Sequence, residues 1–495
     1  MECKGNIDLI LCYHQFLTFL YRFRWVFCQL DALRHCFPPN LRQYLNELPE
    51  TLDETYDRIL KGISKAQKNN AHRLLQCLTV AVRPLLVEEL AELLAFDFQA
   101  SIAGGIPTLK EDWRWDDQEE AIISTCSSLI AIIPRGDSRV VQFSHFSVKE
   151  YLMSSRLAHS PNGEVSRFRI DLEPAHTIMA QACLATLLQL DEHADKSDTN
   201  GSPLAKYAAQ HWVDHAQFEK VSSRVREGMD DLFDGSKPHF AAWLREHDID
   251  ESWQYFRPRS EDGVGSPLYY AAFCGFYDLV ERLIMKHPEQ ENARGGRILS
   301  PLPAALYKKH FRVANLLYSH GAVVDVLDEY ERTPLRIASL HGQVDTMRWL
   351  LDHGADPSSR CHSGHTPLSN AAFTTQLEAV QLLLKYNADI NSQSDEGGTP
   401  LYYASRGDPE GKAADIVRRL LEHGADPNIC DNDHTTPLHE ASSNGSLEAA
   451  RLLLSYGAKV DEKDDGGRTP FQLATSRGHR EMTKLLLEHG AVPQQ

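Results

Sequence analysis

A proline recurs at nearly constant intervals through the C-terminal half of this 495-residue chain. The successive spacings are 34, 33, 33, 33, 37 and 33 residues, a regularity that a random sequence does not produce. Self-similarity at this period is typical of a solenoid built by stacking one supersecondary unit. The seven prolines are Pro267, Pro301, Pro334, Pro367, Pro400, Pro437 and Pro470.

Each proline follows a serine or a threonine, as in Thr436-Pro437. A hydroxyl side chain can cap a helix, and proline at the first helical position loses no helical hydrogen bond, so each pair predicts a helix start. A leucine-rich second helix follows and usually ends at a Gly-Ala pair, or once at Asn387-Ala388, where the left-handed backbone conformation is tolerated. Four copies also carry a glycine eight residues after the proline, which predicts the end of the first helix: Gly275, Gly342, Gly445 and Gly478.

The unit resembles the ankyrin repeat, and Thr436-Pro437-Leu438-His439 matches its consensus start most fully. We therefore predict seven ankyrin repeats over residues 263–495. Two copies depart from the pattern. The fifth has four extra residues within Arg406 to Lys412, and we expect a longer turn there. The second has Pro303 and Lys308-Lys309 at helix and glycine positions, and we expect an irregular first helix.

The resemblance implies that a protein ligand binds on a concave face made of hairpin tips and first helices. Tyr330, Tyr402 and Tyr403 are the expected anchors, because tyrosine combines a large contact area with a polar tip. The alternative for any one residue is an ordinary solvated tip. The predicted partner-binding residues are Tyr330, Arg332, His362, His365, Asp395, Glu396, Tyr402, Tyr403, Asn432, Asp433, Asp465, Arg468 and Arg477.

Charge is uneven along the repeats. The whole chain carries a formal net charge of -18, which argues against broad phosphate binding. Residues 281–312 carry seven Lys and Arg against three Glu, whereas residues 421–470 carry ten acids against four bases. We therefore expect a protein partner with a basic or mixed-charge segment to meet the last three repeats, and we expect neither nucleic acid nor a membrane as a partner.

The N-terminal half is predicted to be helical with one β-hairpin. Thr51-Leu52-Asp53-Glu54 is a capping box that starts a helix, and Val87 to Leu94 forms a later one. Runs at 129–133 and 140–143 flank a turn, which predicts two paired strands, and Ser147 to Glu150 reads as a second capping box. Helices followed by a hairpin predict a winged helix over residues 51–160. The fold class is therefore mainly α, with a winged-helix and helical N-terminal region followed by an ankyrin-repeat α-solenoid.

Phe23-Arg24-Trp25, the segment from Leu48-Pro49 to Tyr56, and Phe143-Ser144-His145 are similar to fungal NACHT and ankyrin proteins, a family of signal-transducing NTPases. In that family these stretches follow the nucleotide-binding domain and include a winged helix like that of the inositol-deacylase group. The resemblance implies that residues 1–50 are the remnant tail of a NACHT-type module, with 1–22 unmatched. Residues 161–262 then form a helical linker with a degenerate ankyrin-like segment.

The chain lacks the Gly-x-x-x-x-Gly-Lys-Ser/Thr loop that holds nucleotide phosphates in that family, and it has no Gly-x-Ser-x-Gly nucleophile motif. We expect no enzymatic activity and no cofactor, and either a natural truncation or an incomplete gene model. His211 and His215 stand four residues apart, a spacing that can bind zinc, but without an evident third ligand we predict no metal.

These observations predict a cytoplasmic interaction protein, with the nucleus as an alternative location. It would be the sensing arm of a NACHT-type signalling protein, acting as a scaffold, a decoy or a regulator of full-length paralogues. Two other functions are alternatives. One is DNA binding through the winged helix, which the acidic segment Val87 to Leu94 opposes. The other is a hydrolase, suggested by the inositol-deacylase resemblance alone.

Overall fold

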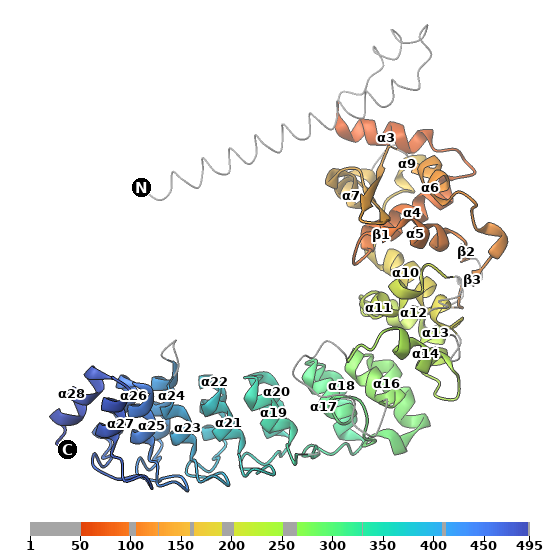
Figure 1. Cartoon of the computed structure of the whole chain (residues 1–495). Helices are drawn as coiled ribbons and strands as arrows, with labels where there is room; N and C mark the ends of the chain where they lie inside the picture. Colours follow the sequence, from red (N-terminus) through yellow and green to blue (C-terminus); the bar gives the residue numbers. More distant parts are fainter. Residues whose placement is uncertain are drawn as a thin grey trace. The chain divides into compact units, whose positions relative to one another are not determined.

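The computed structural model in Figure 1 describes residues 51–98, 105–126, 128–158, 163–190, 202–250, 265–328, 330–407 and 412–493. The chain divides into two compact units, Met1–Gln254 and Tyr255–Gln495. The predicted NACHT remnant at 1–50 lies outside the described residues, and so do residues 408–411 of the predicted long turn. No helix within the described ranges is long and apolar enough to cross a membrane.

The described part of the first unit begins with a winged helix, as predicted. A three-stranded antiparallel sheet of order β1-β5-β4 packs with the helices, and Val141 of β5 pairs with Leu85 on one side and Ile132 on the other. The two-residue strand β1 was not predicted, because a strand this short has no alternation to detect. The elements are α3 (Leu52–Gly62), α4 (Lys68–Val80), β1 (Leu85–Leu86), α5 (Val87–Leu94), α6 (Gln118–Cys126), β4 (Ile130–Arg135) and β5 (Ser138–Phe143).

Three of the four local predictions in this domain are confirmed, among them the hairpin of β4 and β5. Thr51 and Glu54 form the capping box that starts α3, and α5 has the predicted bounds. The second predicted box is wrong: the next helix, α7, is Phe146–Met153, and its N-cap is His145. The Ser147 hydroxyl is instead buried and lies 2.8 Å from the Tyr56 hydroxyl and 2.6 Å from His145 Nδ1. Because His145 caps the helix and Ser147 contacts Tyr56, α7 begins at Phe146 and not after Ser147.

Helices complete the first unit, with α10 packed against both α4 and α11. Trp212 and Trp243 lie at the core of this region with ring centroids 5.4 Å apart, and the Trp243 indole donates a hydrogen bond to the Ala209 carbonyl. The remaining elements are β2 (Phe96–Asp97), β3 (Thr108–Leu109), η3 (Glu111–Trp113), α8 (Ser155–Ala158), α9 (Gly163–Ser166), α10 (Leu172–Leu187), α11 (Ala205–Ala216), α12 (Val221–Arg224), α13 (Arg226–Leu232) and α14 (His239–Glu246).

The second unit is a stack of helix pairs, which we number repeats 1 to 7 (Figure 1). First helices α19, α21, α23, α25 and α27 each pack against the next, and the hairpin tips run along one side of the stack. The pairs are α15 (Pro267–Cys274) and α16 (Tyr277–Lys286); α17 (Pro301–Tyr307) and α18 (Phe311–Ser319); α19 (Pro334–Leu340) and α20 (Val344–Asp352); α21 (Pro367–Phe373) and α22 (Leu377–Lys385); α23 (Pro400–Ser405) and α24 (Lys412–Glu422); α25 (Pro437–Asn444) and α26 (Leu447–Ser455); and α27 (Pro470–Ser476) and α28 (Arg480–Glu488). A short helix η4 (Pro288–Gln290) follows α16.

The predicted turns hold in the repeats, and so do the predicted hydroxyl caps except in repeat 2, where the Ser300 side chain makes no cap hydrogen bond. Gly275, Gly342, Gly445 and Gly478 have φ between 63° and 77°, and Asn387 has φ 58°. In repeat 2, however, the expected irregular helix is wrong, because α17 is a helix with proline at its start. Pro303 falls in the first turn, where backbone N–H groups have no helical acceptor, so the ring costs no hydrogen bond. Lys309 takes the left-handed position usually held by glycine.

Candidate protein-binding surface

The hairpin tips of repeats 3 to 7 are joined by backbone hydrogen bonds. The His362 N–H donates to the Tyr330 carbonyl at 3.1 Å, and the Asp395 N–H donates to the Ser363 carbonyl at 3.1 Å. The ladder continues from Asn432 N–H to the Glu396 carbonyl at 2.9 Å and from Asp465 N–H to the Asp433 carbonyl at 3.0 Å. These bonds fix successive tips in register, so the side chains of different repeats form one continuous surface.

In the hairpin tips of repeats 3, 6 and 7, an aspartate side chain accepts hydrogen bonds from the backbone of the tip. In repeat 3, Asp328 accepts hydrogen bonds from the backbone N–H groups of Tyr330 and Arg332. It also forms an ion pair with the Arg332 side chain, with Nε 2.6 Å from the carboxylate. Asp464 does the same with Arg468 in repeat 7. Burial opposes ionisation of Asp464, but the Arg468 hydrogen bonds hold the pKa of this carboxyl below its ordinary value. Such tips are preorganised, which reduces the ordering cost of binding.

The predicted partner-binding residues fall into three groups by exposure. Arg332 and His365 are half-buried, whereas Tyr402 and Tyr403 are buried. Arg477 follows the last first helix, α27. The exposed members, nearly all on the tip ladder, are Tyr330, His362, Asp395, Glu396, Asn432, Asp433, Asp465, Arg468 and Arg477.

Two of the expected anchors do not present large surfaces. Tyr402 is 8% exposed and Tyr403 is 6% exposed. The Tyr402 hydroxyl donates to Glu440 of the next repeat at 2.9 Å, and the Tyr403 hydroxyl lies 2.9 Å from Ser394 Oγ. The expectation of a large contact area is therefore wrong for these two rings, which stabilise contacts between and within repeats. Tyr330 differs, because 54% of it is exposed and the Arg332 guanidinium lies 5.0 Å from its ring.

The negative charge of the last repeats is partly used inside the tips. Asp431 accepts from the N–H groups of Asp433 and Thr435, and Asp464 pairs with Arg468. Asp465 lies 2.7 Å from His434 Nδ1. A partner can therefore reach fewer than the ten acids that residues 421–470 contain. Asp433 and Asp465 are exposed on the hairpin tips.

Phe373 was missed by the sequence reasoning. It ends α21, is 52% exposed, and meets the Tyr403 ring edge-to-face with centroids 6.1 Å apart. The available signal was a large apolar residue at the position where repeats 6 and 7 carry Ser443 and Ser476. The Phe373 ring is thus held by Tyr403 and adds apolar contact area at the end of a first helix.

Helix α5 would be the recognition helix under the alternative of DNA binding, but its buried acidic side chains pair within the protein. Glu89 is 1% exposed and makes a bidentate ion pair with Arg83, with bonds of 2.8 and 2.6 Å. Glu92 is 3% exposed and pairs with Arg114 at 2.9 Å. These carboxylates are therefore structural, and α5 offers no lysine or arginine to a phosphate.

The histidine pair His211 and His215 does not converge on one point. His215 is fully buried, with Nδ1 3.0 Å from His176 Nδ1 and Nε2 2.9 Å from the Tyr207 hydroxyl, whereas His211 pairs with Asp214. Burial and the neighbouring His176 lower the pKa of His215 to about 3. Across the described ranges, no group of three or more His, Cys, Asp or Glu residues could hold a metal ion.

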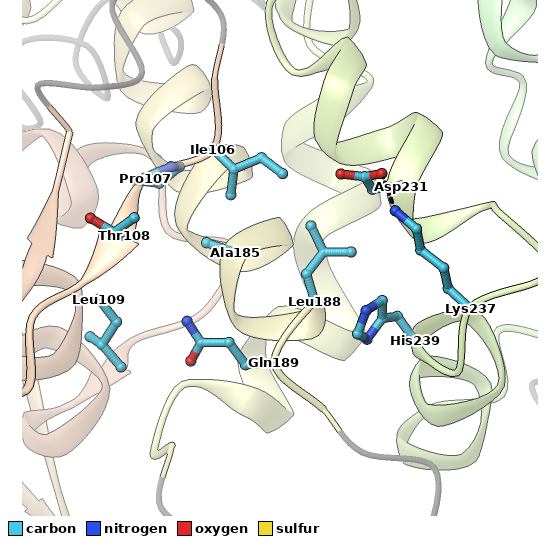
Figure 2. A pocket seen from close by; sticks show the side chains of 10 residues that line it. All are labelled: Ile106, Pro107, Thr108, Leu109, Ala185, Leu188, Gln189, Asp231, Lys237 and His239. Carbon is cyan, nitrogen blue, oxygen red and sulfur yellow. Dashed lines mark hydrogen bonds and ion pairs between the residues drawn. The ribbon is translucent and has the colours of Figure 1, made fainter.

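A pocket of about 460 Å³ lies within the first unit. Figure 2 shows the side chains that line it. The segment Ile106–Leu109 and the end of α10 supply apolar walls, and His239 of α14 lies on the opposite side. Lys237 on the rim is neutralised by an ion pair with Asp231. The lining residues include no serine, cysteine or threonine paired with a base, so they form no nucleophilic site.

Comparisons with known proteins agree with this architecture. The profile "Ankyrin repeats (3 copies)" matches residues 268–361, 357–428 and 408–495, and the profile "GPI inositol-deacylase, winged helix domain" matches residues 56–164. The chain thus contains ankyrin repeats and a winged helix similar to that of the inositol deacylases. Both domain types were predicted from the sequence, whereas no comparison shows a NACHT domain.

Two fungal proteins are among the relatives. "Azaphilone pigments biosynthesis cluster protein L" of Monascus ruber is 32% identical over 300 residues, which cover 57% of this chain and 61% of that protein. "Ankyrin repeat protein nuc-2" of Neurospora crassa is 32% identical over 188 residues, 38% of this chain and 17% of that protein. The human "Ankyrin repeat and SOCS box protein 16" is 34% identical over 185 residues, 36% of this chain and 40% of that protein. The chain therefore spans less than two thirds of each of these relatives.

Proposed function

We propose that this chain is a non-enzymatic recognition protein whose ankyrin repeats hold a ligand protein on the hairpin tips and first helices. The tip ladder carries this proposal. Backbone hydrogen bonds fix the tips of five successive repeats, while Tyr330, His362, Asp395, Asp433 and Asp465 remain exposed on them. A rigid, chemically varied surface of this kind suits specific protein recognition, because few side chains must be ordered when the partner binds.

The acidic tips define one end of the proposed contact. Asp395, Asp433 and Asp465 are exposed on consecutive tips, so a basic segment of the ligand would meet three carboxylates in a row. Charge complementarity of this kind mainly supplies specificity and faster association. The Arg360 and His434 contacts to these acids would be exchanged for contacts with the partner.

We further propose that recognition serves a NACHT-type signalling system in the cytoplasm, with full-length paralogues as additional partners. The proposal rests on the resemblance of the N-terminal segments to NACHT and ankyrin proteins, in which the repeats sense the ligand and an NTPase domain responds. The winged-helix match agrees with the domain order of that family. DNA binding remains the alternative for the winged helix. The burial of Glu89 and Glu92 in α5, and the absence of basic residues there, argue against it.

Affinity capture with the full chain tests the proposal. The triple variant Asp395→Lys, Asp433→Lys and Asp465→Lys reverses the tip charge. The matched control is Glu378→Lys, Glu448→Lys and Glu481→Lys, which changes net charge equally but on exposed positions of the second helices. We expect the control to retain the proteins captured by the natural chain and the tip variant to lose them. Equal capture by both variants, or no specific capture by the natural chain, would contradict the proposal.

A further inference from the structure

In repeats 4 to 7, the side chain that follows each Thr-Pro-Leu or Thr-Pro-Phe triplet has a hydrogen-bond partner in its own helix start or in the next repeat. The side chains of Ser369, His439 and Gln472 each accept a hydrogen bond from the N-cap N–H of their own helix. The Tyr402 hydroxyl donates to Glu440. Repeat 3 places Arg336 at this position. Repeat 3 therefore has an arginine at a position where repeats 4 to 7 have side chains with hydrogen-bond partners inside the protein.

The Arg336 side chain makes no hydrogen bond or ion pair with any residue that the structure describes, and its Nε atom is buried without an acceptor. The nearby Asp328 is already used by two backbone N–H groups and by Arg332. Burial lowers the pKa of Arg336. A half-buried guanidinium without a counter-ion is unfavourable, and native proteins usually pair such groups.

Arg332, the Asp328 carboxyl and the Cys361 thiol all lie near enough to Arg336 to affect its pKa, but Arg332 already holds Asp328. His365 is half-buried, and burial together with the Arg336 charge lowers its pKa. His341 is affected in the same way by burial and Arg332. With their pKa values lowered, both imidazoles are mainly neutral near pH 7 and add little positive charge beside Arg336. Exposed Tyr330 lies beside Arg332 at the edge of this region.

We propose that repeats 3 and 4 bind an acidic peptide segment of the partner, with the Arg336 guanidinium donating hydrogen bonds to one of its carboxylates. Planar bidentate pairing with carboxylates is the interaction for which the guanidinium is best suited. The inference rests on the proposed function and deepens it. The ligand then has two charged parts, an acidic part at repeats 3 and 4 and a basic part at the tips of repeats 5 to 7.

The test uses the full chain and two fluorescent probes, a 12-residue peptide of alternating Glu and Gly and its Lys-Gly counterpart. Binding is followed by fluorescence anisotropy at low salt. The variant is Arg336→Gln, which removes the charge and keeps much of the length. The matched control is Arg348→Gln, an exposed arginine on second helix α20 of the same repeat. We expect Arg336→Gln to weaken Glu-Gly binding about tenfold and Arg348→Gln to leave it nearly unchanged.

Thermal melting separates binding from folding. If Arg336 is an unpaired binding group, Arg336→Gln melts at the same temperature as the natural chain or higher, since binding residues often cost stability. A clear fall in melting temperature would assign Arg336 a structural role and overturn the inference. Glu-Gly binding that is absent, or equal in the two variants, would overturn it as well. Failure of the proposed function is distinct, because it is read from the capture experiment with the acidic tips.

Discussion

Acidification should weaken the first unit through one buried histidine, His215. Three hydrogen bonds determine its protonation. The Val82 N–H donates to the Tyr207 hydroxyl, which therefore has its own proton free for His215 Nε2. His215 Nδ1 then carries the proton and donates to His176 Nδ1. This is the one arrangement that uses every donor, and it requires a neutral His215.

The magnitude follows from the difference in pKa between the folded and the unfolded chain. Burial lowers the pKa of His215 from 6.5 to about 3 in the folded protein. The unfolded chain therefore binds the proton first, and stability is complete above pH 6.5 and falls as the pH drops toward 3. Linkage gives a loss of about 2 kcal/mol between pH 7 and pH 5 from this group alone.

Hydrogen exchange of peptides from α10 and α11 measures this loss locally, after correction for the intrinsic pH dependence of exchange. His215→Gln keeps one donor and one acceptor and removes the titration. We expect its opening free energy to fall by about 2 kcal/mol less than that of the natural chain between pH 7 and pH 5. His239→Gln of α14, which preserves a donor to the Leu190 carbonyl, is the control. The same pH slope in the natural chain and in His215→Gln would refute the reasoning.

Two further predictions concern stability and can be measured by urea or thermal denaturation. Arg83→Ala should destabilise the first unit by about 3–5 kcal/mol, because it leaves the buried Glu89 carboxylate unpaired. Arg156→Ala, at the exposed pair with Asp53, should cost less than about 1 kcal/mol. Similar losses of stability in the two variants would contradict a structural role for Glu89. Gly445→Ala and Gly478→Ala both strain a residue with positive φ, by about 1–2 kcal/mol, but only at Gly445 would the new Cβ lie 2.7 Å from His479. The first should therefore cost more, and equal costs would mean that His479 moves away freely.

Local sequence signals predicted much of this fold because they act over a few residues. The Thr-Pro pairs start the first helices, glycine or asparagine ends helices where φ is positive, and the bounds of α5 follow from its apolar spacing and the preceding proline. Each of these effects depends on backbone hydrogen bonds within one or two turns, so it can be read without knowing the tertiary partners. The charge difference between the early and late repeats is likewise a property of the sequence.

The tertiary structure decided which side chains remain available. Tyr402 and Tyr403 look like Tyr330 in the sequence, yet Glu440 and Ser394 cover the first two and leave the third exposed. The Tyr402 contact joins residues 38 positions apart, and no local pattern encodes it. Arg336 is different, because Asp328 is close to both Arg332 and Arg336 in the sequence, and only the structure shows that Arg332 holds it.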